Sequence, residues 1–175
     1  LHKETHVALA LSGGKDSLTL LFFLHAMKNR GLANFELTAI HVSGEYSCGA
    51  GVNQQYLRAI CHELGVPFIV KESFQTLEKL ECYSCSRERR KLLFDAAKEA
   101  GSTTIAFGHH RDDHVQTLLL NLFHKGEFCG NLAKVNMERY GITIIRPLFY
   151  ASEELIKDFS KLHGYCRITC QCPVG

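Results

Sequence analysis

A buried strand that ends in a double-glycine turn constrains the fold of this chain more than any other feature. Val7 to Leu11 is a near-continuous apolar run, as expected of a central strand. The run breaks at Ser12-Gly13-Gly14, and a helical leucine pattern follows, with Asp16 or Ser17 as its predicted N-cap. Short apolar strands then alternate with helical patterns. This order predicts an α/β fold with a doubly wound, mostly parallel, five-stranded sheet and helices on both faces.

The remaining elements follow from periodicity and from the positions of glycine and proline. The predicted strands after the first are 35–42, 67–71, 103–107 and 142–145, with a short further strand at 165–169. The predicted helices after the first are 53–64, 87–100, 112–124 and 153–162. Residues 72–86 have no clear period, and 125–140 reads as an irregular loop. In the helix 112–124 we expect four apolar side chains to face inward: Val115, Leu118, Leu119 and Phe123.

Composition limits the class of protein. The 175 residues suit one domain, 1–175, and 46% hydrophobic with 22% charged residues is normal for a globular chain. No apolar run approaches the roughly 18 residues of a membrane span, and the first residues lack the apolar core of a signal peptide. We therefore expect a soluble cytoplasmic protein without membrane contact. A net charge of +2 neither requires nor excludes a nucleic-acid partner.

The segment Ser12 to Ser17 has the chemistry of an anion site. Its glycines allow backbone amides to approach a ligand, and the following helix N-terminus favours phosphate or pyrophosphate. The candidate ligand-binding residues are Ser12, Gly13, Gly14, Lys15, Asp16 and Ser17. Lys15 supplies a cation, and Asp16 can orient a magnesium ion or the loop itself. A tight turn with a polar cap is the simpler alternative, although six such residues in succession after a buried strand make it the weaker one.

A second candidate site, Gly108 to Asp113, follows the fourth predicted strand. Parallel strands bring their carboxyl ends to one edge of a sheet, so this segment is expected beside the glycine turn. Asp112 and Asp113 open a helix and can coordinate Mg²⁺. Simple N-capping by Asp112, with His109 and His110 on the surface, is the alternative. His41 ends the second strand at the same edge, where nucleotide contact and a partly buried strand histidine are equally compatible with its position.

The cysteines form the third candidate site. Among eight cysteines, Cys82 and Cys85 form a C-x-x-C pair, and Cys170 and Cys172 a C-x-C pair. Such pairs can hold structural zinc, ligate an iron–sulfur cluster or act as a redox pair, although the redox pairs of thioredoxin-like folds belong to a different topology. The arginines at 87–90 can offset the charge of thiolates, contact RNA phosphates or simply be solvated.

These motifs resemble a known superfamily. The sequence S-G-G-K-D-S at Ser12 to Ser17 matches the signature of the PP-loop ATP pyrophosphatases, which have the adenine nucleotide alpha hydrolase-like fold. C-x-x-C-S-R-x-R-R from Cys82, G-H-H-R-D-D from Gly108, I-R-P-L from Ile145 and the terminal cysteines follow in order. Together they resemble the tRNA 2-thiocytidine synthetase (TtcA-like) family, whose terminal P-C-x-x-C pattern this chain replaces with Cys170-Gln171-Cys172-Pro173.

The resemblance implies an ATP-dependent tRNA thiolase, that is, a tRNA sulfurtransferase. Such an enzyme adenylates the C2 oxygen of a pyrimidine, here cytidine, releases pyrophosphate and replaces the oxygen with sulfur. It implies ATP binding by Ser12 to Ser17, His41, Gly108, His109 and Asp113, and catalytic roles for Lys15, Asp16 and Asp112. It also implies Mg²⁺, a tRNA partner, a sulfur donor (a cysteine desulfurase or sulfide) and a homodimer.

The same resemblance implies a [4Fe–4S] cluster. Three cysteines would hold it: Cys82, Cys85 and one of Cys170 and Cys172, with the fourth iron open to carry sulfide. Two other functions remain open. One is an amide-forming PP-loop ligase with a structural zinc site, and the other is a nucleotide-binding regulator whose zinc knuckle contacts a partner without turnover.

Overall fold

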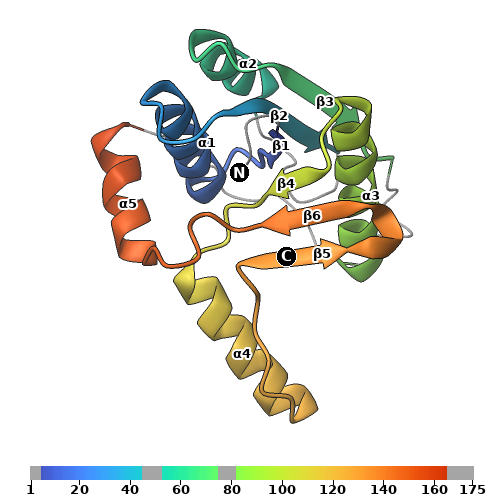
Figure 1. The fold of residues 1–175 in the computed structure, drawn as a ribbon. Helices are drawn as coiled ribbons and strands as arrows, with labels where there is room; N and C mark the ends of the chain where they lie inside the picture. Colours follow the sequence, from blue (N-terminus) through green and yellow to red (C-terminus); the bar gives the residue numbers. More distant parts are fainter. Residues whose placement is uncertain (1–4, 45–52, 75–81, 165–175) are drawn as a thin grey trace.

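The structure, a computed structural model, describes residues 5–44, 53–74 and 82–164 of the chain. Strands and helices alternate along most of these residues, as predicted (Figure 1). The strands are β1 (Thr5–Ala10), β2 (Phe35–Ser43), β3 (Phe68–Glu72), β4 (Thr104–Ala106), β5 (Lys134–Met137) and β6 (Ile142–Ile145). The helices are α1 (Lys15–Asn29), α2 (Gln54–Glu63), α3 (Cys82–Glu99), α4 (Arg111–Lys125) and α5 (Glu153–Leu162). The predicted strand 165–169 and the C-x-C pair lie outside the described residues.

Within the described residues, the sheet contains six strands in the order β3-β2-β1-β4-β6-β5. All neighbours are parallel except β5 and β6, which are antiparallel. The prediction of five strands was therefore one short, and the prediction of an irregular 125–140 segment was wrong at β5. This edge strand has only four residues, of which Lys134 and Asn136 are exposed. Its polar side chains produce no apolar run, so the sequence pattern did not reveal it.

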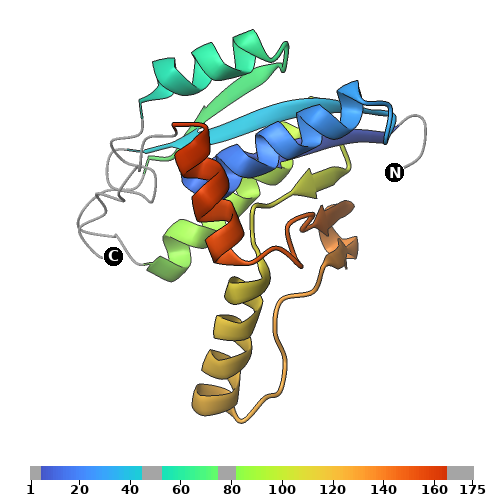
Figure 2. The same cartoon turned by 90° about the vertical axis from the view of Figure 1, so that its left-hand side faces the viewer.

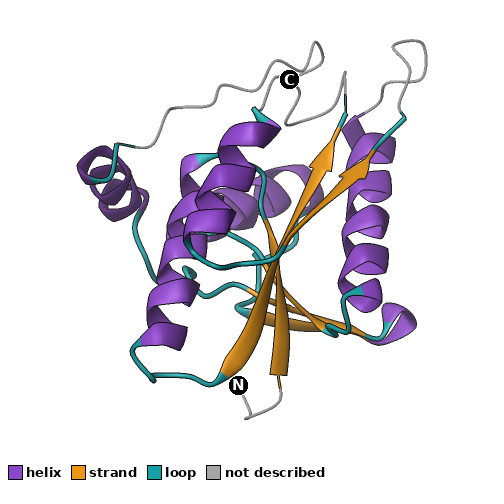
Figure 3. Cartoon of the chain, turned by 90° about the horizontal axis from the view of Figure 1, so that it is seen from above, coloured by secondary structure: helices purple, strands orange, loops and turns teal. Residues whose placement is uncertain are grey.

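The core has two layers because the sheet is covered on both faces (Figure 3). On β1, Val7 and Leu9 pack toward α1, α2 and α5, whereas Ala8 packs toward α3. Phe94 of α3 is buried on that second face, beside Ile105 of β4. Alternate residues of each strand therefore belong to opposite layers, as the period of two in a strand requires. None of the described helices is long and apolar enough to cross a membrane.

Helix α3 begins earlier than its sequence pattern predicts. The predicted start was Arg87, but the helix starts at Cys82 and thus includes the C-x-x-C pair in its first turn. Cys82 and Tyr83 are exposed, and only Cys85 of these first four residues is buried. With one buried side chain, this turn has no apolar period that could mark it as helical.

Helix α4 projects away from the rest of the molecule (Figures 1 and 2). The prediction that its apolar side chains face inward was wrong: Val115, Leu119 and Phe123 are 45%, 43% and 78% exposed. No residue of α4 is buried. The period of an amphipathic helix indicates that one face is apolar, but it does not indicate which element covers that face.

A matched pair of leucines tests the location of the core. Leu20 of α1 is fully buried, whereas Leu32, which follows the helix, is exposed. We expect Leu20→Ala to lower the free energy of unfolding by about 2–5 kcal/mol, because it leaves a cavity. Leu32→Ala should stay within about 0.5 kcal/mol of wild type. Urea unfolding followed by circular dichroism measures both, and equal losses would contradict this assignment of the core.

Candidate active site at the carboxyl edge of the sheet

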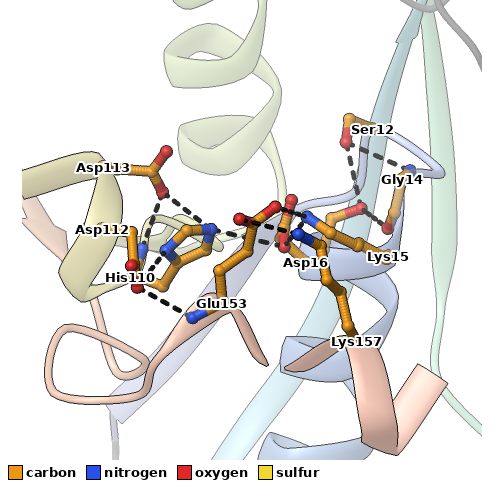
Figure 4. A network of polar contacts seen from close by, with 10 residues as sticks. Ser12, Gly14, Lys15, Asp16, His110, Asp112, Asp113, Glu153 and Lys157 are labelled. Carbon is orange, nitrogen blue, oxygen red and sulfur yellow. Dashed lines mark hydrogen bonds and ion pairs between the residues drawn. The ribbon is translucent and has the colours of Figure 1, made fainter. Parts of the chain in front are cut away.

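The loop between β1 and α1 is held in shape by its own hydroxyl groups (Figure 4). The Ser17 Oγ accepts a hydrogen bond from the Gly13 amide (3.1 Å) and donates one to the Gly14 carbonyl oxygen (3.0 Å). The Ser12 hydroxyl donates to the same Ser17 Oγ at 3.0 Å. Gly13 has a φ of 89°, a conformation that favours glycine. The loop is therefore fixed by residues within the predicted anion-binding segment.

The amino end of α1 carries no side-chain cap. Its N-cap residue is Gly14, with extended backbone angles of φ −73° and ψ 164°, and the helix begins at Lys15. The prediction that Asp16 or Ser17 caps the helix was wrong, because both already lie in its first turn. A helix N-terminus without a side-chain cap offers its first amide groups to an anion. This geometry suits the predicted phosphate ligand.

Gly108 brings the second predicted segment against this loop. A Cβ atom placed on Gly108 would lie 2.9 Å from the backbone carbon of Asp16 and 3.0 Å from the amide nitrogen of Ser17. No side chain fits there, so the backbone at Gly108 lies directly on the first turn of α1. The two segments predicted to meet at the carboxyl edge do meet, and glycine is the residue that permits the close approach.

Charged side chains from three helices surround this contact. Lys15 Nζ lies 2.8 Å from Asp16 Oδ1 and 3.4 Å from Glu153 Oε1. Lys157 also pairs with Glu153, at 2.9 Å. Burial acts to lower the pKa of Lys15, but the hydrogen bonds and charges of Asp16 and Glu153 raise it above its ordinary value. The ammonium group of Lys15 is therefore charged at neutral pH and positioned beside the loop.

His110 occupies the middle of the acidic groups and is only 5% exposed. Its Nε2 lies 3.5 Å from Asp113 Oδ2 and 3.7 Å from Asp16 Oδ1, and its Nδ1 lies 3.7 Å from Asp112 Oδ2. Asp113 also accepts a hydrogen bond from the His110 amide at 2.8 Å. The imidazole thus lies between carboxylates from α1 and α4 (Figure 4).

Asp112 connects α4 to α5. Its Oδ2 accepts a hydrogen bond from the Glu153 amide at 2.8 Å, at the first residue of α5. This bond, from an amide at a helix N-terminus, lowers the pKa of Asp112 below its ordinary value. The ion pair with Lys157, followed by that with Lys15, lowers the pKa of Glu153 as well. Both groups are therefore carboxylates at neutral pH.

Two predicted ATP-binding histidines lie at the same edge but outside this network. His41 is fully buried, and its Nδ1 donates to the Leu11 carbonyl oxygen at 2.8 Å, which links the end of β2 to the loop. Burial lowers the pKa of His41. His109 packs against Phe107, with 5.7 Å between ring centroids. Burial, and then the charge of Arg146, lowers the pKa of His109. Both imidazoles are neutral at pH 7.

Cys82 and Cys85 lie three residues apart at the start of α3. This helix follows β3, and Ser73, just after β3, donates a hydrogen bond to Glu88 of α3 at 3.0 Å. The cysteine pair therefore belongs to the same edge of the sheet as the glycine turn. Among the described residues, no three histidine, cysteine, aspartate or glutamate side chains form a metal site. Cys170 and Cys172, predicted to supply the remaining thiolate, lie outside those residues.

Comparison with known proteins identifies the family. The family model of the PP-loop domain matches residues 2–167. The chain belongs to the PP-loop family. A tRNA-cytidine(32) 2-sulfurtransferase of Cellvibrio japonicus is 37% identical over 94% of this chain and 56% of its own length. The corresponding protein of Pelobacter propionicus is 35% identical over 100% of this chain and 67% of its own length. These matches confirm the resemblance to the TtcA-like branch, although the chain spans only about half to two thirds of such relatives.

Solved structures confirm the fold. The U34-tRNA thiolase NcsA from Methanococcus maripaludis, solved with its [4Fe-4S] cluster, superimposes with a TM-score of 0.80. It is 22% identical, and the match covers 100% of this chain and 62% of NcsA. A phosphoadenylyl-sulfate reductase from Candida auris is more distant, with a TM-score of 0.54 and 12% identity over 95% of this chain and 75% of its own. At these identities the likeness concerns the PP-loop fold alone.

Glu153 and His110 are the members of this PP-loop site that sequence reasoning missed. Glu153 belongs to a helix capped by Ser152, 41 residues beyond Asp112, and nothing in its local pattern relates it to the loop. His110 stands inside a recognised motif, but its pattern is equally that of a surface residue. The packing of α5 beside α1 brings Glu153 to the site, and only the fold reveals this proximity.

The glycine contact can be tested against a second glycine in the same site. We expect Gly108→Ala to lower the free energy of unfolding by about 1–3 kcal/mol, because its Cβ would overlap the backbone of α1. Gly14→Ala should have little effect, since its φ is negative and its Cβ would lie 3.7 Å from the nearest atom, Ser12 Oγ. Urea unfolding compares the two variants. Equal stability of both would contradict the close approach.

Proposed function

We propose that this protein is an ATP-dependent tRNA thiolase that converts a cytidine to 2-thiocytidine. The observation that carries the proposal is the position of the C-x-x-C pair at the same sheet edge as an uncapped, glycine-rich PP loop. The loop suits a pyrophosphate-releasing activation, and the cysteines suit sulfur chemistry. Relatives named as tRNA-cytidine(32) 2-sulfurtransferases support the choice of tRNA and cytidine.

In this proposal the loop Ser12 to Ser17 and the amino end of α1 bind the ATP phosphates. Backbone amides provide the hydrogen bonds, and the charged Lys15 offsets the phosphate charge. Mg²⁺ usually retains waters and needs only one or two carboxylates beside the phosphates. Asp16, Asp112 and Asp113 are the candidates, since all three surround His110. Gly108, His41 and His109 are proposed to border the nucleotide.

The reaction then needs two displacements. The C2 oxygen of the base attacks the α-phosphorus, the bond to the β-phosphate bridging oxygen breaks, and pyrophosphate leaves. Sulfide, as HS⁻, next bonds to C2, the C2–oxygen bond breaks to release AMP, and the added sulfur loses its proton to leave the C2=S group. The contribution of the PP-loop residues is to hold the reactants in place and to stabilise charge on the phosphates. The proposed sulfur source, in the cytoplasm, is sulfide itself or the persulfide of a cysteine desulfurase, which two electrons from a thiol reductant convert to sulfide.

The residues present fit a [4Fe–4S] cluster as far as the described residues extend. Thiols at positions i and i+3 of a first helical turn lie on the same side, and a helix N-terminus stabilises thiolates. Cys82 and Cys85 would be two ligands, and Cys170 or Cys172 the third. When bound, such a cluster would present sulfur to the activated base. The ligase alternative instead requires zinc at these cysteines, and a brown or colourless protein after anaerobic purification separates the two.

Nucleoside mass spectrometry of tRNA tests the proposal. Cells that lack the gene should lose 2-thiocytidine, and the wild-type gene should restore it. Cys82→Ala and Cys85→Ala should each restore none, because each removes a cluster ligand, while leaving ATP affinity within about twofold of wild type. Cys129→Ala is the matched control, since Cys129 lies in the exposed segment after α4.

Three outcomes would contradict the assignment. Loss of a 2-thiouridine in place of 2-thiocytidine would move the protein to a sister thiolase activity. Thiolation at the wild-type level by Cys82→Ala would exclude the proposed cluster. If tRNA causes no pyrophosphate release at all from ATP, the nucleotide-binding regulator becomes the better description.

We also propose that the active form is a homodimer joined through α4. The interface would be formed by exposed apolar side chains of α4 and of the segment that follows it: Val115, Leu119, Leu120, Leu122, Phe123, Phe128 and Leu132. An antiparallel pair of α4 helices would cover this face. It would also bring Asp112 and Asp113 of one copy toward His124 and Lys125 of the other, so that opposite charges meet at both ends.

Sedimentation of the purified full-length protein tests this interface. Leu120→Glu and Phe123→Glu should convert a dimer to a monomer at micromolar concentration, because each places a charge in the apolar contact. Leu155→Glu, at an exposed site on α5, should leave the dimer intact. A monomeric wild type, or α4 variants that remain dimeric, would show that something other than a second copy covers this face.

A further inference from the structure

Two arginines and a histidine gather on the α3 side of the sheet edge, away from the acidic network. Arg146 directly follows β6. It stands two residues after Ile144 and four after Ile142, so it shares their face of the sheet, which packs toward α3. His109 follows β4 two residues after Phe107, which also packs toward α3. Because β4 and β6 are parallel neighbours, Arg146 and His109 lie side by side at the carboxyl edge.

Helix α3 adds Arg90 to this group. Arg90 stands one turn before Phe94 and two turns before Ala97, both of which are buried against the sheet. It therefore continues the sheet-facing stripe of α3 beyond the end of the sheet, where it is exposed. The positive charge of Arg90 contributes to lowering the pKa of both Arg146 and His109. Three separate elements thus bring basic side chains to one place.

These basic groups have little counter-charge within the described protein. Among the described residues, neither Arg90 nor Arg146 makes an ion pair. The negative charge of Asp113 acts to raise the pKa of His109, but its carboxylate accepts a hydrogen bond from the His110 amide. Arg146 is fixed through its Nη1, which donates to the Leu132 carbonyl oxygen, while its buried Nε has no partner. Burial, and then the charge of Arg90, lowers the pKa of Arg146.

We propose that Arg90 and Arg146, with His109 beside them, bind a backbone phosphate of the substrate RNA next to the nucleotide to be modified. This inference rests on the proposed function and adds to it where the RNA strand lies. The guanidinium group matches phosphate geometry with paired donors. His109 is neutral, so the two arginines supply the charge.

The position of Arg90 and Arg146 favours RNA over the phosphates of ATP as their ligand. The ATP phosphates are proposed to bind the loop and the amino end of α1, and α1 covers the sheet face opposite to α3. The target base must reach from that loop toward Cys85, which lies about one and a half turns before Arg90 on α3. An RNA nucleotide whose base lies between the loop and Cys85 would have its own phosphate near the α3 side, where the arginines gather.

Binding measurements on the full-length protein test this site, with an unmodified tRNA transcript as the probe. Arg90→Gln and Arg146→Gln should each weaken tRNA binding about tenfold or more and should lower the slope of log affinity against log salt by roughly 0.7–1. Arg146→Lys should retain most of the salt slope, since it keeps the charge. Arg30→Gln, at the exposed end of α1, is the control. Arg90 is exposed, so its variant should fold even if Arg146→Gln does not.

Parallel measurements separate the possible anions. ATP and inorganic pyrophosphate should bind the arginine variants with unchanged affinity, and the visible absorption of the cluster should also be unchanged. Weakened ATP binding with intact tRNA binding would overturn the proposal in favour of a nucleotide phosphate. Loss of cluster absorption would instead assign the arginines to the thiolates.

Thiolation by the wild type separates failure of this site from failure of the proposed function. If wild-type protein thiolates tRNA while Arg90→Gln binds it with the wild-type salt slope, the phosphate site is wrong and the function stands. If wild-type protein neither binds nor thiolates tRNA, the proposed function fails, and the phosphate site fails with it.

Discussion

The contact between Gly108 and the first turn of α1 determines where the other groups of this site lie. Because a Cβ atom at this position would come within 2.9 Å of the Asp16 backbone, the end of β4 cannot carry a side chain toward the loop. The segment that follows β4 therefore packs directly on the first turn of α1, and the residues after Gly108 enter the site at once. His110 reaches the carboxylate of Asp16 only because of this approach.

From that contact the charges of the site are assembled by hydrogen bonds between elements far apart in the chain. Asp112 accepts from the first amide of α5, and Glu153 of that helix approaches Lys15 of α1. Three helix N-termini, those of α1, α4 and α5, thus meet at one edge. Helix N-termini stabilise negative charge, which explains why carboxylates gather here and why a phosphate ligand is compatible with the same place.

The sequence predicted those parts of the fold that local apolar patterns determine. The first strand, the glycine loop and the Gly108 segment were recognisable because each combines a buried run with residues of special backbone or charge chemistry. The edge strand β5 was not, since Lys134 and Asn136 interrupt its apolar pattern. The first turn of α3 was missed because Cys85 is its only buried residue before Arg87.

Within the site, the limit of prediction was long-range proximity. Glu153 and His110 have ordinary local contexts, and their role depends on how α5 and α4 start beside α1. The apolar face of α4 shows the reverse case. Its period was read correctly as amphipathic, but the expected burial against the sheet does not occur, because the helix leaves the edge of the sheet instead of covering a face.

The extended backbone at His110 explains how one edge can hold both acidic and basic groups. His110 has φ −120° and ψ −176°, so successive side chains point to opposite sides. His110 meets the carboxylates beside α1, whereas His109 meets Arg90 and Arg146 on the α3 side. In the proposed reaction, the first side carries the ATP phosphates and their metal ion, the second carries the RNA strand and the cysteines, and His109 borders both. Gly108 stands between these two sides, and because it has no side chain its backbone packs directly on the first turn of α1, which keeps the two sides adjacent.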